Sequence, residues 1–167
     1  WQRSVRTNKW NIDDTINFSH CVPRRLSAEQ LTDAIAVATA VPTMLAGLPP
    51  GTRAVEAADG AIKGNDFLEL FGRPKRDSAC ECARTNNLSL SHALNLVGGE
   101  TIHNAIVDPK CRVSSLIKKG STDSQIVKEL FWATLSRPPS KQELSSLAKF
   151  GEGASRLLAA QDLLWAL

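Results

Sequence analysis

The sequence predicts an all-α fold, an irregular helical bundle of about six to eight helices with one long ordered loop. Apolar residues recur at helical spacing along several segments. Three Ser/Thr-x-x-Gln/Glu capping signatures stand before such segments. Only 5% of the residues are aromatic and tyrosine is absent, so a core built mainly of Leu, Ala, Val and Ile is expected, a palette that favours helices.

The length and charge limit the protein class. A chain of 167 residues suits a single helical domain, residues 1–167. The net charge of +3 is too small to indicate a nucleic-acid partner, and no run of 18 apolar residues predicts a membrane span. The chain begins without methionine and stops within an apolar helical pattern, so we expect a fragment of a larger multi-domain protein.

The first elements are an arm and a helix. Residues 1–22 show no sustained period and are expected to form an irregular arm, or a short helix near 13–17, packed on the body. Ser27 and Gln30 then form a capping box for a helix over about 28–40. The apolar anchors expected in the arm are Trp1, Trp10, Ile12, Ile16 and Phe18.

A long loop follows over residues 42–65, which hold three prolines and four glycines. Its apolar residues predict that it lies on the surface of the body, with a short extended piece at 52–56. Asn65 and Gly72 then bound a short helix.

The second half of the chain reads as consecutive helices. Ser89 caps a helix that ends at Gly98 and Gly99, and its apolar stripe is expected to face the core. That stripe consists of Leu90, Ala93, Leu94 and Val97. The further helical segments are 100–107, 111–120, 122–137, 138–150 and 154–167, the last with Leu157, Leu158, Gln161, Leu164 and Trp165 on one face.

The candidate site is the segment Cys80–Glu81–Cys82. Its spacing matches no paired zinc knuckle, but a composite metal site with His92 stays open, as does a strained, reducible C-x-C pair. A disulfide from one of these cysteines to Cys21 or Cys111 is a further alternative. The structural interpretation is a network of ion pairs that holds the segment, with Arg73, Arg76, Glu81 and Arg84 as its members.

Other chemistry finds little support in the sequence. The C-x-x-C-H motif of covalent haem attachment is absent, so no cofactor is expected in this chain, and no G-x-S-x-G elbow is present. We therefore assign no catalytic residue. If the chain were an enzyme, we would expect a cleft that brings Cys80, Cys82, Arg84 and His92 together with His20 and Arg24.

Several segments together resemble one protein family. They are "NFSHCVPRRLSAEQLTDAI", "GLPPGTRAVE", "FLELFGRPKRDSACECARTNNLSLSHALNLVGG", "IVKELFWATLSRPPSKQEL" and "QDLLWAL". This pattern is similar to the C-terminal part of the planctomycete cytochrome-C-associated PSD family, domain of unknown function 1553. The resemblance implies a large, exported, multi-domain bacterial protein, periplasmic or extracellular, with haem in a cytochrome-c-like domain elsewhere in the parent protein.

The resemblance supplies no catalytic residue. It implies partners in other domains of the same polypeptide. Because no catalytic constellation is present, the first hypothesis is a non-catalytic scaffold or interaction domain. Ala83 replaces an acidic residue of the family pattern, and Cys21 and Cys111 stand where the family has other residues. The family's last turns are missing, which predicts an exposed apolar edge near residues 163–167. The enzyme, redox and metal-binding alternatives, and the oligomeric state, stay open.

Overall fold

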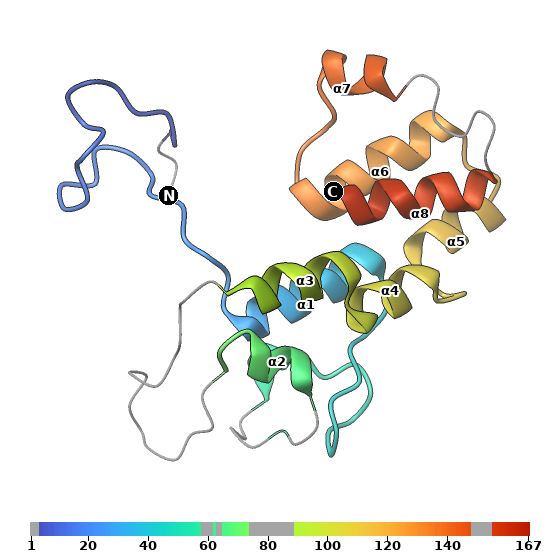
Figure 1. Cartoon of the computed structure of the whole chain (residues 1–167). Helices are drawn as coiled ribbons and strands as arrows, with labels where there is room; N and C mark the ends of the chain where they lie inside the picture. The colour runs from blue at the N-terminus through green and yellow to red at the C-terminus, as the bar shows by residue number, and fades with distance from the viewer. Residues whose placement is uncertain (1–3, 58–61, 63–64, 74–88, 148–154) are drawn as a thin grey trace.

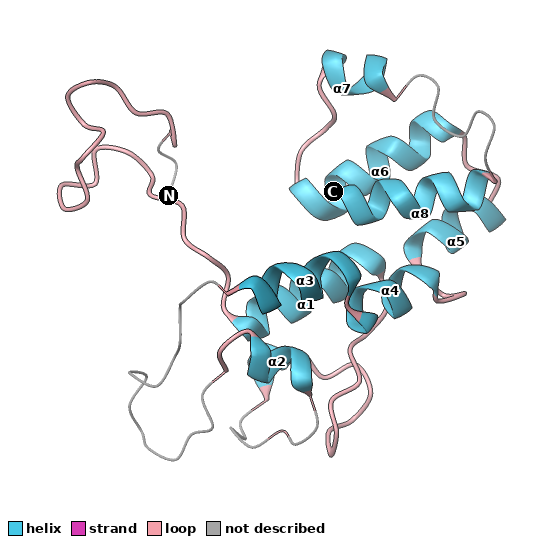
Figure 2. Cartoon of the chain, viewed as in Figure 1, coloured by secondary structure: helices cyan, strands magenta, loops and turns pink. Residues whose placement is uncertain are grey.

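The fold is helical in a computed structural model of the chain, which describes residues 4–57, 62, 65–73, 89–147 and 155–167 (Figure 1). Figure 2 shows helices joined by loops, with no strand in these residues, which confirms the predicted all-α class. The number of helices is close to the expected six to eight. Their bounds are α1 Ala28–Thr39, the 3-10 helix η1 Ala54–Glu56, α2 Asp66–Leu70, α3 Leu90–Gly98, α4 Glu100–Val107, α5 Arg112–Lys118, α6 Asp123–Leu135, α7 Lys141–Ser146 and α8 Arg156–Ala166.

Local capping fixes where the helices start. The predicted box at α1 is formed: Ser27 Oγ accepts the Gln30 N–H at 3.3 Å, and Gln30 Oε1 accepts the Ser27 N–H at 3.0 Å. The boxes predicted at α6 and α7 are formed in the same way. Each box satisfies backbone donors that the first helical turn leaves without a partner.

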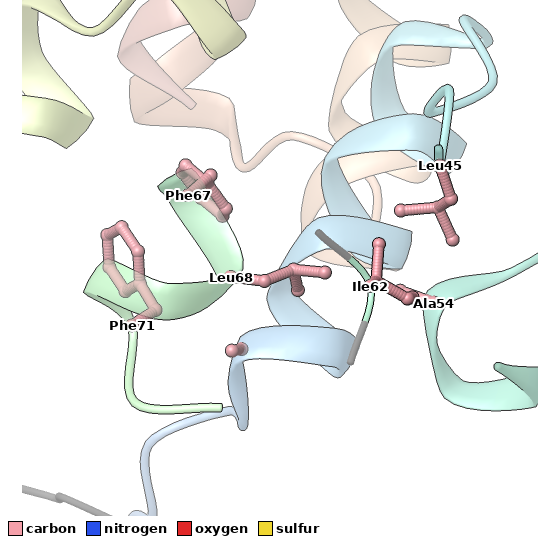
Figure 3. Close-up of a cluster of buried hydrophobic side chains, with 7 residues drawn as sticks. Leu45, Ala54, Ile62, Phe67, Leu68 and Phe71 are labelled. Carbon is pink, nitrogen blue, oxygen red and sulfur yellow. The ribbon is translucent and has the colours of Figure 1, made fainter. Parts of the chain in front are cut away.

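Two clusters of apolar side chains form the interior, and α1 contacts elements of both. In the first cluster, α1 packs against η1 and α2, and Figure 3 shows Leu68 reaching from α2 towards α1. The first cluster consists of Ala28, Leu45, Ala54, Ile62, Phe67, Leu68 and Phe71. The second is built on α4, α5, α6 and α8, with Ile106, Cys111, Val113, Ile126, Leu130, Ala160 and Leu164.

The guanidinium of Arg112 joins three helices. It donates from Nε to Ala38 O at 2.9 Å and from Nη2 to Val37 O at 2.7 Å, which satisfies carbonyls in the last turn of α1. Its Nη1 lies 2.9 Å from Glu129 Oε1 on α6. A single side chain of α5 therefore holds the C-terminal end of α1 against α6.

The described part of the N-terminal arm is irregular, one of the two predicted forms, but it does not pack on the body as expected. Its described part forms turns without a helix at 13–17, and Figure 1 shows it running away from the helices. Trp10 and Ile16 are 84% and 78% exposed, so the expected packing on the body is wrong for these anchors. The Asp14 carboxylate accepts the backbone N–H groups of Ile16, Asn17 and Ser19. Such local side-chain bonds stabilise a turn in place of a helix.

The piece at 52–56 is not extended, because residues Ala54–Glu56 form η1. Asp33 of α1 explains the difference. Its carboxylate accepts the N–H of Ala54 at 2.7 Å and that of Val55 at 3.2 Å, and it is 7% exposed. A carboxylate 21 residues away in the sequence thus caps this turn, which no local pattern could indicate.

The apolar stripe of α3 also differs from its prediction. Leu90, Leu94 and Val97 are 75%, 62% and 63% exposed, and the buried residue of this helix is His92. The expected burial of the stripe is therefore wrong within the described part of the chain. The reason is tertiary: α3 contacts α4 at its end, and its apolar side faces solvent.

The last helix, α8, buries a narrower face than predicted. Ala160 and Leu164 are buried, whereas Leu158 and Trp165 are 55% and 51% exposed. The exposed edge expected over 163–167 is therefore confined mainly to Trp165, since Leu164 belongs to the second cluster.

Candidate functional site

The sequence-predicted site is only partly within the described residues. Cys80, Cys82, Glu81, Arg76 and Arg84 lie outside them, so the composite metal site, the redox pair and most of the ion-pair network stay predictions. Arg73 and His92 are described. They border this segment on its two sides in the sequence.

Arg73 makes a buried ion pair. Its Nε lies 3.8 Å from Glu29 Oε1 in the first turn of α1, with side chains 8% and 11% exposed. Its Nη2 donates to Ala57 O at 3.4 Å. The arginine predicted to hold the cysteine segment thus links the end of α2 to α1 and to the residue after η1. The sequence did not single out Glu29 as a partner of Arg73. An acidic residue in the first turn of a helix is already explained by its favourable interaction with the helix dipole.

His92 is buried beside aromatic rings. Its ring meets that of Phe71 edge-on, with centroids 5.0 Å apart, and Phe71 stacks on Phe67 at 4.4 Å. His92 Nδ1 accepts the Ser89 N–H at 3.1 Å and lies 2.6 Å from Ser89 Oγ. The imidazole therefore closes the start of α3 in the way that Gln or Glu closes a capping box.

The Ser89–His92 pair has the spacing of a nucleophile and its base, but its hydrogen bonds assign it a different role. Because the backbone N–H of Ser89 donates to Nδ1, that nitrogen carries a lone pair and the neutral ring has its proton on Nε2. If Nδ1 took the proton of the Ser89 hydroxyl, the new N–H of the ring would point at the backbone N–H of Ser89. Two donors would then face each other. The geometry therefore supports a helix cap over proton transfer.

The residues proposed for an enzyme cleft are not brought together where they are described. His20 lies in the arm and Arg24 in the segment between the arm and α1. No hydrogen bond, ion pair or ring contact between described residues joins either of them to His92. Cys21 and Cys111 are free thiols, so the alternative of a disulfide through either of them is not supported. Among the described residues no group of three or more His, Cys, Asp or Glu side chains is arranged to hold a metal ion.

A second feature, which the sequence analysis missed, is a groove between α4 and α8. It has a volume of about 250 Å³ and opens beside the end of α3. We use the name apolar face for this groove together with the exposed stripe of α3. Its exposed side chains include Leu90, Leu94 and Val97 of α3 and Leu158, Asp162 and Trp165 of α8. The apolar stripe of α3 was the signal for this face in the sequence. Its helical spacing predicted a buried side, so an exposed surface was not expected there.

Together, the fold and these contacts define an all-α domain whose buried polar groups hold helices and whose apolar face is exposed. Residues 1–151 match the family described as protein of unknown function DUF1553, PSD1, and the chain belongs to this family. No curated protein and no solved structure matches the chain. In the described residues, no helix is both long enough and apolar enough to cross a membrane.

Proposed function

We propose that this chain is a non-catalytic helical interaction domain that packs against other domains of a larger exported bacterial protein. The observation that carries the proposal is the apolar face. Three large side chains of α3 and two of α8 are between 51% and 75% exposed. Exposed apolar side chains scattered singly are ordinary, but a contiguous patch marks an interaction site.

The energetics favour a covered face. Burying a Leu or Val side chain completely gains about 1.5–3 kcal/mol. Helix α3 buries only His92 among its own residues, so its packing alone supplies little to hold it. A partner that covers Leu90, Leu94 and Val97 would stabilise the helix and remove this surface from water.

The polar groups near the candidate site support a structural role. Arg73 pairs with Glu29, His92 closes the start of α3, and Arg112 closes the end of α1. Each is used in a contact that holds two segments together. The redox or metal-binding alternative depends on Cys80 and Cys82 and is tested separately below.

The resemblance supplies the proposed setting. The resemblance implies that proteins of this family are typically large and exported, and that they often carry a cytochrome-c-like domain. We place the chain in such a parent protein, in the periplasm or outside the cell, with haem held by another domain.

The experiment has two measurements. An antibody raised against the chain should detect a polypeptide well above 18.1 kDa in the source cells. Hydrogen exchange of the α3 amides should then be fast in the isolated chain and clearly slower in the parent protein, because covered helices open less often. A native product of 18.1 kDa, or equal exchange in both forms, would overturn the proposal.

A further inference from the structure

The apolar face is built like a binding site for a helix. On α3, Leu90, Leu94 and Val97 follow one another at i, i+4 and i+7 and are exposed. On α8, Leu158, Asp162 and Trp165 repeat the same spacing along one wall of the groove. Residues at this spacing share one side of a helix, and grooves between such sides receive amphipathic helices.

Helix α4 forms the opposite wall. Ile102 and Ile106 line the groove from α4, and Ile106 is buried in the second cluster. Gly98 and Gly99 line its end beside α3. Val97 of the α3 stripe lines the groove as well, so the stripe continues the surface of the groove.

The charged residues of the groove indicate which charge the partner carries. Among the described residues that line the groove, Asp162 is the one carboxylate, and none is Lys or Arg. It forms no hydrogen bond or ion pair with any other described residue, and neither does Glu100, which follows Gly99 at the start of α4. His103 is the one basic side chain among these described lining residues.

We propose that the apolar face binds an amphipathic helix that carries Leu-like residues at i, i+4 and i+7 and a Lys or Arg beside them that pairs with Asp162. The inference rests on the proposed interaction role and names the chemistry of the partner. The cation would be shielded from water by the apolar rim, where a pair with a carboxylate contributes more than at an open surface. A second copy of the chain is the competing occupant.

The test uses the full chain and two fluorescent helical peptides of about 18 residues, long enough to be helical. Both peptides carry the same leucine stripe, flanked by Lys in one and by Glu in the other. The lysine peptide should bind the chain at least about tenfold more tightly than the glutamate peptide. Asp162→Lys should reverse this preference, whereas Glu69→Lys, an exposed change on α2 outside the groove, should leave it unchanged.

The outcomes separate the alternatives. Equal binding of the two peptides, or equal effects of the two lysine variants, would overturn the inference. A dimer in light scattering that dissociates with Leu94→Ser would assign the face to a second copy and would also overturn it. Slower α3 exchange in the parent protein, together with failure of the peptide test, would leave the interaction role standing and reject only this partner chemistry.

Discussion

At the scale of single residues, the corner between α3 and α4 depends on one of two adjacent glycines. A Cβ built at Gly99 would clash with Asn95 O and would lie 2.8 Å from Asn95 Oδ1. A Cβ at Gly98 would meet nothing within 4 Å. Gly98 and Gly99 are therefore two adjacent positions at which the same Gly→Ala change should have different effects.

Gly99→Ala should lower the free energy of unfolding by about 1–3 kcal/mol, because the backbone oxygen of Asn95 cannot move away freely. Gly98→Ala should be neutral or slightly stabilising, since alanine favours the helix at this position. Urea denaturation of both variants checks this. If the two variants were equally stable, the close approach of Gly99 to Asn95 would be refuted.

The cysteines differ in access. Cys111 is fully buried, and burial raises the pKa of its thiol, so it should resist alkylation in the native protein. Cys21 is half-buried and should react sooner. Intact mass after alkylation, with and without denaturant, measures both, and all cysteines should react once the chain is unfolded.

The same sample tests the Cys80–Glu81–Cys82 segment. Two free thiols without bound metal would agree with a structural segment. A bond that is released by reduction, or a stoichiometric metal ion that is lost on alkylation, would favour the redox or metal-binding alternative. Rapid alkylation of native Cys111 would contradict its burial.

At the scale of elements, α7 is held at its start by a charged contact. Arg137 donates to both carboxylate oxygens of Glu143, at 2.8 and 2.6 Å, and Glu143 also accepts the Ser140 N–H at 2.7 Å. The hydrogen bonds of Arg137, and then those of Ser140, lower the pKa of Glu143 to about 2.

Because the folded pKa lies below the ordinary value of 4.5, this contact stabilises the folded chain above about pH 4.5. The contribution is lost as the pH falls through about 2. Carbon NMR titration of the Glu143 carboxyl should give this low pKa, and Arg137→Met should move it upward. An unchanged pKa in that variant would show that Ser140, and not Arg137, causes the shift.

At the scale of the whole molecule, the two apolar clusters meet at α1, and Arg112 is one of the contacts between them. Arg112→Met keeps much of the side-chain length but removes three hydrogen bonds. We expect a loss of about 1–3 kcal/mol, because carbonyls of α1 lose their donors.

Hydrogen exchange can locate that effect. The amides of Leu68 and Leu130, one in each cluster, should open at more similar free energies in the wild type than in Arg112→Met. Lys128→Met, an exposed change on α6, is the control. If Arg112→Met and the control had the same exchange, Arg112 would not couple the clusters.

The predictable parts of this fold are those decided by residues close in the sequence. The boxes at Ser27, Thr122 and Ser140 join groups three residues apart, so the pattern alone locates those helix starts. In the candidate site, the sequence identified Arg73 and His92 as residues to examine. It did not find Glu29 as a partner of Arg73, because they are far apart in the sequence.

The sequence by itself determined the all-α class, the family and most helix starts, because helical period and capping are local properties. Tertiary structure decided which side of each helix is covered. The stripe of Leu90, Leu94 and Val97 has the spacing of a core face, yet it faces solvent. Apolar residues at helical spacing indicate that one side of a helix is suited to burial. Only the positions of the other elements determine whether this chain covers that side or leaves it for a partner.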